Sequence, residues 1–167
     1  MKQYTYKGRI YSVVKCVKED IPSHIERVSS YWTADGVDVE QQTRLLEDCI
    51  NNGIALQLVN DKGNTQAVIY GLWMKCDDIK SHLLWIRSKK LFTILAWYLR
   101  EHAYIRNIYF MPHSKSLIPF EFLVKPMSIR RFYSHNAPLA IDLYSPNNQL
   151  MGTPIAVGLL DGSIKEL

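Results

Sequence analysis

Hydrophobic and polar positions alternate with a period of two from Ile10 to Val17, which predicts a first strand. After Asp20, which can cap a helix, apolar residues recur at helical spacing and share one face. These residues are Ile21, Ile25, Val28 and Trp32. A second helix is predicted to begin at Asp38, where Gln41 completes an arrangement similar to a capping box, and to end at Asn52-Gly53.

The period of two returns in the middle of the chain. Ile54 to Val59 and Thr65 to Met74 are rich in β-branched and aromatic residues and flank a polar turn, so they predict a hairpin. Gly71 inside the second strand predicts a bulge or the close approach of another backbone. The polar stretch Lys75 to Ser81 predicts a turn, and His82 to Ile86 predicts a strand that pairs with the hairpin.

Lys89 to Ala103 is apolar nearly all round, which predicts a helix buried on a sheet face. Only a narrow stripe through Lys89, Thr93 and Arg100 is predicted to be exposed, and Asn107 to Met111 predicts the next strand. The C-terminal part is less regular. A short helix, two strands and a terminal hairpin are predicted there, within Ser114–Val124, within Ser128–Tyr133 and Leu139–Tyr144, and within Pro154–Leu160 and Ser163–Leu167.

Composition fits one soluble α/β domain over residues 1–167, because 47% hydrophobic and 22% charged residues suffice for a single core. Cys16, Cys49 and Cys76 are widely spaced and form no Cys-x-x-Cys pair, which indicates a reducing compartment and no metal site. No apolar run approaches the roughly 20 residues that cross a bilayer, so we expect a cytoplasmic protein without membrane contact. The net charge of +4 permits an anionic partner without indicating a nucleic acid.

One segment combines a strand, a turn and a helix in an order typical of phosphate sites. Arg87 and Ser88 lie at the turn, so backbone N–H groups at the helix start can face an anion. Arg87, Lys89 and Lys90 place three cations where the helix dipole disfavours them, and a bound anion would remove this conflict. The segment has no glycine that would let a ligand approach the backbone closely. A phosphate site and a solvated basic turn are both compatible with this pattern.

The order strand, helix, helix, hairpin, strand, long helix, strand, short helix and hairpin resembles the GNAT acyltransferase superfamily from about Tyr11 to Tyr144. The resemblance rests on the hairpin from Gly53-Ile54-Ala55-Leu56 to Gly71-Leu72-Trp73 and on the strand, turn and helix from Leu83 to Ala103. It implies an α/β (α+β) fold with a central mixed, twisted sheet of six to seven strands and helices on both faces.

In that family an acyl-CoA, such as acetyl-CoA, lies where the strand before the long helix splays from the next strand. The resemblance therefore implies cofactor contacts for Leu84, Trp85, Ile86, Arg87, Ser88, Lys89 and Lys90. The family's pyrophosphate loop reads Arg/Gln-x-x-Gly-x-Gly/Ala, and only Arg87 of this chain matches it. His113 and Phe120 take the places of an asparagine and of the tyrosine that protonates the leaving thiolate. These departures resemble the degenerate GNAT-like proteins of short-tailed phages, some of which travel in the virion.

For acid–base chemistry the family often uses a carboxylate or a water chain on the central strands. Asp78 and His82 lie near that place, next to Asp77, and an imidazole titrates near working pH. The alternative is that these three residues are ordinary turn or surface groups. His113 and His135 could line the cleft, or could be structural.

Three functions stay open at this point. The first is an acyl-CoA-dependent N-acyltransferase with a small-molecule acyl donor, in which an amine attacks the thioester directly. The second is a GNAT-like pseudoenzyme that binds a protein partner, forms a homo-oligomer or is built into a virion. The third is a nucleic-acid-binding module, suggested by Arg130-Arg131-Phe132-Tyr133, for which an amphipathic strand with exposed arginines is the simpler interpretation.

Overall fold

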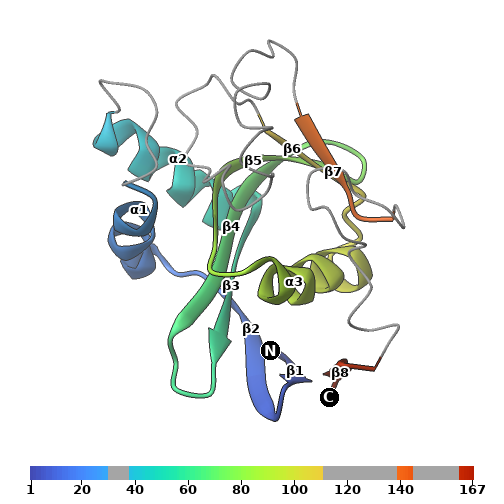
Figure 1. The fold of residues 1–167 in the computed structure, drawn as a ribbon. Coiled ribbons are helices and arrows are strands. Elements are labelled where there is room, and N and C mark those ends of the chain that lie inside the picture. The colour runs from blue at the N-terminus through green and yellow to red at the C-terminus, as the bar shows by residue number, and fades with distance from the viewer. Residues whose placement is uncertain (30–37, 111–138, 145–161) are drawn as a thin grey trace, which may run out of the picture.

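The computed structural model describes residues 1–29, 38–110, 139–144 and 162–167 (Figure 1). Eight strands form one sheet in the order β7-β6-β5-β4-β3-β2-β1-β8. Neighbouring strands are antiparallel except for β5 and β6, which are parallel. The strands are β1 (Lys2–Tyr6), β2 (Arg9–Lys15), β3 (Ile54–Asn60), β4 (Thr65–Lys75), β5 (Asp78–Ile86), β6 (Asn107–Phe110), β7 (Leu139–Asp142) and β8 (Ile164–Glu166). The helices are the 3₁₀ turn Lys18–Asp20, α1 (Ile21–Ser29), α2 (Val39–Asn52) and α3 (Lys89–His102).

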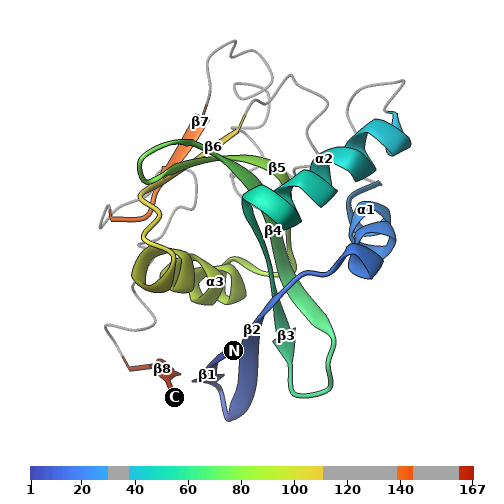
Figure 2. The ribbon, with the colours of Figure 1, turned by 180° about the vertical axis from the view of Figure 1, so that it is seen from behind.

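Helices cover both faces of the sheet, as the two opposite views show (Figures 1 and 2). Side chains alternate along each strand, so neighbouring residues of one strand enter different cores. Ile69 and Leu84 pack with α3, whereas Tyr70 and Leu83 pack with α1 and α2. The predicted mixed α/β sheet with helices on both faces is confirmed. The described residues contribute eight strands rather than six to seven, because segments at the two termini add β1 and β8 at one edge.

Local sequence signals place α2 and its junction with the hairpin. The Asp38 carboxylate accepts a hydrogen bond from the Gln41 amide at 3.2 Å, which confirms Asp38 as the N-cap. Gly53 follows the last turn and lies against β4, where an added Cβ would be 2.2 Å from the Gly71 carbonyl oxygen. The register of β4 and β5 shifts between Tyr70 and Gly71, which confirms the predicted irregularity at Gly71.

Two predictions in the centre of the chain were wrong. The polar stretch Lys75 to Ser81 is not all turn, because β5 begins at Asp78 and buries Ile79 in the core beneath α3. Thr93 is not on an exposed stripe. The Thr93 side chain is buried, and its hydroxyl, which is its only polar group, donates a hydrogen bond to the Lys90 carbonyl within the helix.

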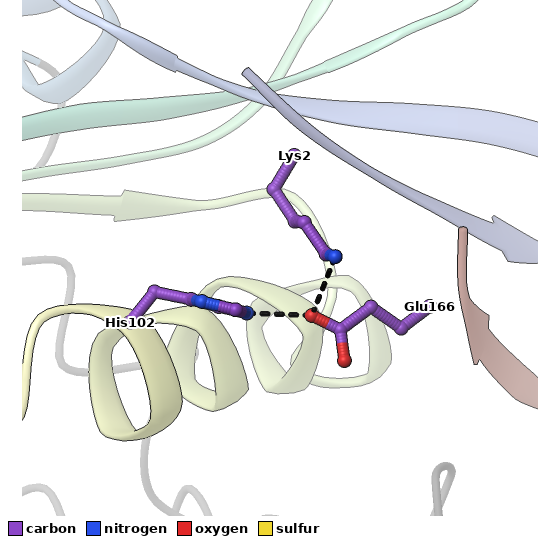
Figure 3. Close-up of polar contacts among 3 residues, drawn as sticks. All are labelled: Lys2, His102 and Glu166. Carbon is purple, nitrogen blue, oxygen red and sulfur yellow. Dashed lines mark hydrogen bonds and ion pairs between the residues drawn. The ribbon is translucent and has the colours of Figure 1, made fainter.

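The termini meet at one edge of the sheet, where β1 pairs with both β2 and β8. Figure 3 shows Lys2, His102 and Glu166 converging from β1, α3 and β8. The Glu166 carboxylate lies 3.3 Å from the Lys2 ammonium and also pairs with the His102 ring. Burial acts to raise the pKa of Glu166, but the hydrogen bonds from His102 and Lys2 outweigh it and lower that pKa. This cluster of polar contacts links β8 to α3 and β1.

Several predicted elements lie outside the described residues. They are the short helix within Ser114–Val124, the strand within Ser128–Tyr133, the strand within Pro154–Leu160 and the helical position Trp32. Among the helices that the structure describes, none is both long and apolar enough to cross a membrane.

Candidate functional site

The parallel strands β5 and β6 pair over a short distance only. Their ladder joins three residue pairs, from Asp78 with Asn107 to Lys80 with Tyr109. Beyond Lys80, β5 runs on from Ser81 to Ile86 with β4 on one side and no strand from the described residues on the other. We call the region where β5 runs on beyond its three pairs with β6 the wedge. The Asn107 side-chain amide donates to the Asp78 carboxylate at 2.9 Å and links the two strands at the paired end of the wedge. Beyond Lys80, this edge of β5 has no partner within the described residues, and the strand leads directly to the start of α3.

The start of α3 has fewer free donors than a glycine-rich loop would offer. Ser88 is the N-cap, and its hydroxyl accepts from the Leu91 amide at 3.2 Å. The amides of Lys89 and Lys90 come earlier in the helix, where no carbonyl of the helix can accept their hydrogen bonds. The Arg87 amide donates to the Gln66 carbonyl at 3.0 Å, while its side chain is exposed. Among the described residues, the donors at this helix start therefore include two backbone amides and the exposed Arg87 guanidinium.

The Lys90 ammonium lies 5.9 Å from the centre of the Tyr6 ring, so its side chain reaches toward β1. Leu84, Trp85 and Ile86 are the last residues of β5, Arg87 and Ser88 form the turn, and Lys89 and Lys90 begin α3.

His82 occupies a bulge in β5. Leu83 pairs with Tyr70 and Ser81 pairs with Gly71, so His82 has no partner residue on β4. The bulge also explains why Ile79 and Leu84 enter the same core although strict alternation would place them on opposite faces. Burial, followed by the charge of Lys80, lowers the pKa of His82, and the Asp48 carboxylate on α2 partly opposes this. The imidazole is thus neutral at pH 7 and able to accept a proton.

Asp78 and His82 are not brought together. They are four positions apart on one strand, which corresponds to about 13 Å. Asp78 is buried at the paired end of the wedge with Asn107, whereas His82 lies beside the open part of β5. Asp77 lies in the exposed turn before β5 and accepts a backbone hydrogen bond from Arg106. Phe120, His113, His135 and the segment Arg130-Arg131-Phe132-Tyr133 lie outside the described residues.

Sequence reasoning missed a buried polar network between α1 and the sheet. The His24 ring is 2.7 Å from the Tyr70 hydroxyl at Nδ1 and 3.2 Å from Gln57 Oε1 at Nε2. Gln57 in turn donates from Nε2 to the Asp20 carboxylate at 3.3 Å. A carboxylate only accepts, so Gln57 presents its carbonyl to His24, His24 carries its proton on Nε2, and Tyr70 donates to Nδ1. Burial lowers the pKa of His24, in keeping with this neutral tautomer.

Cys16 is buried in the same core as Tyr70. Burial raises the pKa of the Cys16 thiol to about 12, so this cysteine is not a nucleophile at neutral pH. A pocket of about 170 Å³ also opens beside Cys16, two strands away from β5 and thus outside the wedge. Its lining consists of Lys15, Cys16, Ile50, Gly53, Ile54, Ala55 and Leu56.

The described residues contain the element order that the family resemblance implied: a strand, a turn and a long helix, with the strand paired in parallel to the next one over three residues. No protein-family model matches the chain, and no curated protein matches it either.

Solved structures with a partly similar arrangement include a chimera of the Vibrio cholerae spermidine N-acetyltransferase SpeG and hSSAT, with 9% identity, coverage of 60% of this chain and 69% of that chain, and a TM-score of 0.46. Another is a GNAT-family acetyltransferase from Listeria monocytogenes, with 14% identity, coverage of 65% and 80%, and a TM-score of 0.41. Likeness at this level assigns no activity to this chain.

Proposed function

We propose that this protein is an acyl-CoA-dependent N-acyltransferase. The observation that carries the proposal is the wedge: β5 and β6 pair over three residues, and β5 then runs on to the N-terminus of α3 with β4 on one side and, among the described residues, no strand on the other. An unpaired strand edge offers N–H and C=O groups in a row, and an extended molecule with amide groups can add to it as a further strand. Pantetheine is such a molecule.

The residues present fit an acyl-CoA, which supplies an activated acyl thioester when bound. The edge formed by Leu84, Trp85 and Ile86 would hold the pantetheine amides. The amides of Lys89 and Lys90 would hold the pyrophosphate at the positive end of the α3 dipole, with the exposed Arg87 side chain beside it. Ser88 contributes by fixing the first turn through its bond to Leu91.

Acyl transfer to an amine needs positioning and a proton acceptor more than a covalent nucleophile. His82 is the side chain that we assign to proton removal, because its imidazole is neutral at pH 7 and lies where β5 loses its regular pairing. Asp78 then has a positioning role, since its bond to Asn107 holds the two strands together where the wedge closes.

The primary test is the melting temperature of the protein with and without acetyl-CoA. A ligand of the native state at one hundred times its Kd stabilises it by about 2.7 kcal/mol, which raises the melting temperature of a chain of this size by roughly 5–10 °C. Arg87→Ala should weaken binding about tenfold or more, because a hydrogen bond to a charged group is worth about 1.5–3 kcal/mol. Arg9→Ala removes an equally exposed cation from β2 and serves as the control. No shift at millimolar acetyl-CoA would contradict the proposal.

The second candidate is a GNAT-like protein that binds acyl-CoA without turning it over. The absence of glycine at the turn and the use of the Ser88 hydroxyl in capping favour this alternative, because both reduce the room and the donors for a pyrophosphate. Release of free thiol in the presence of a panel of amines separates the two. Turnover that His82→Gln abolishes supports the enzyme, and binding without turnover supports the pseudoenzyme.

A further inference from the structure

Arg27, in the last turn of α1, has a buried donor that is unpaired within the part of the chain that the structure describes. Its guanidinium lies over the Trp85 ring, 4.9 Å from the ring centre. The Nε atom is buried without a hydrogen-bond partner, and none of the ion pairs among the described residues involves Arg27. A guanidinium that lies over an aromatic ring is restricted in its motion, and its planar fork of donors suits two oxygens of a carboxylate or phosphate.

Arg27 also lies on a particular side of β5. Leu83 packs in the core beneath α1 and α2, and Trp85 packs against the same core. His82 is within the electrostatic influence of Asp48 on α2. Arg27 therefore lies over the face of β5 that Leu83 and Trp85 turn toward α1 and α2. Trp85 and His82 are three positions apart, which places the two functions about 10 Å from each other.

Resting on the proposed acyl transfer, we propose that Arg27, which lies over the Trp85 ring, binds an anionic group of the acyl acceptor. The acceptor is then an amine that also carries a carboxylate or a phosphate. Its anionic end would be held at α1 while its amine reaches the wedge near His82. An acceptor with amino groups only would be disfavoured, because the Arg27 charge repels it in a partly desolvated position.

The test measures binding of four small amines to the full chain by titration calorimetry. The probes are 4-aminobutyrate, 3-aminopropyl phosphate, the uncharged 4-aminobutanamide and the diamine putrescine. Wild type is expected to bind at least one anionic amine about tenfold tighter than the amide and the diamine. The anionic probe that binds more tightly shows whether the site prefers a carboxylate or a phosphate. Arg27→Gln should lose this preference, and Arg27→Lys, which keeps the charge but not the fork, should retain only part of it.

Three results would overturn the inference: equal binding of the acid and the amide by wild type, an unchanged preference in both Arg27 variants, or no binding of either anionic probe. An Arg27 that only covers Trp85 would change the melting temperature on substitution without changing the ratio between acid and amide. The acetyl-CoA shift is measured in the same variants and should equal that of wild type. If acetyl-CoA binds but the probes are not discriminated, this inference fails alone. If acetyl-CoA fails to bind wild type, the proposed function fails.

Discussion

Tyr70 and Tyr4 provide a matched pair for testing whether the buried network holds the fold together. Both rings are 0% exposed, each in one of the two cores. The Tyr70 hydroxyl lies 2.7 Å from His24 Nδ1, whereas the Tyr4 hydroxyl is buried without a partner among the described residues. The same Tyr→Phe substitution therefore removes a satisfied hydroxyl in one case and an unsatisfied one in the other.

The two substitutions should change stability in different directions. Tyr70→Phe leaves His24 Nδ1 buried without a donor, which costs about 1–3 kcal/mol. For a chain of this length that corresponds to a fall in melting temperature of roughly 2–12 °C. Tyr4→Phe removes a buried group that has no partner, so it should be neutral or stabilising by up to about 1 kcal/mol.

Urea unfolding followed by fluorescence and far-UV circular dichroism measures both free energies, and equal m-values show that the comparison is valid. Combining Tyr70→Phe with His24→Leu should give a loss smaller than the sum of the single losses by at least about 0.5 kcal/mol, because the two side chains share one bond. The reasoning is refuted if Tyr70→Phe lies within about 0.5 kcal/mol of wild type, or if Tyr4→Phe is equally destabilising.

The remaining predictions concern a close contact, a pH dependence and a helix cap. Gly53→Ala puts a methyl group 2.2 Å from the Gly71 carbonyl oxygen and should cost about 1–3 kcal/mol in urea unfolding; an unchanged midpoint would contradict the contact. The lowered pKa of His24 means that the unfolded chain binds its proton first, so stability should fall as pH drops below about 6.5, and His24→Gln should flatten the melting temperature between pH 7.5 and 5.5. A profile as steep as that of wild type would refute this. Ser88→Ala should cost about 1 kcal/mol and Ser88→Gly only a few tenths, and equal losses would argue against the cap.

Local chemistry explains which parts of the fold were predictable. Asp38 and Gly53 mark the two ends of α2 through groups within a few residues, so the sequence alone locates them. The start of β5 is different. Asp78 and Lys80 are polar, yet they lie in the sheet because β4 and β6 flank them on both sides. Likewise, β1 is polar along much of its length and becomes a strand by pairing with β2 and β8.

In the candidate site, too, the parts set by local sequence were predictable and the parts set by long-range contacts were not. The strand, turn and helix around Arg87 follow from a continuous pattern, and the structure keeps them adjacent. The bond between His24 and Tyr70 joins residues 46 positions apart, and the contact of Arg27 with the Trp85 ring likewise joins different elements. Neither contact has a local signature, because both depend on how α1 is laid across the sheet.

The bulge at His82 determines which side chains of β5 face α3 and which face α1 and α2. Leu84 and Ile86 point into the core beneath α3, and the strand then delivers Arg87 and the α3 N-terminus, which suit a phosphate. Trp85 faces the opposite side, toward Arg27. With strict alternation, Ile79 and Leu84 could not share a core, so the extra residue is needed to bury both ends of β5 on one face. It is also the position at which regular pairing with β4 is lost. The residue that the packing of β5 requires is therefore the residue to which we assign proton removal, so the proposed chemistry of His82 depends on the same irregularity that keeps the strand in the sheet.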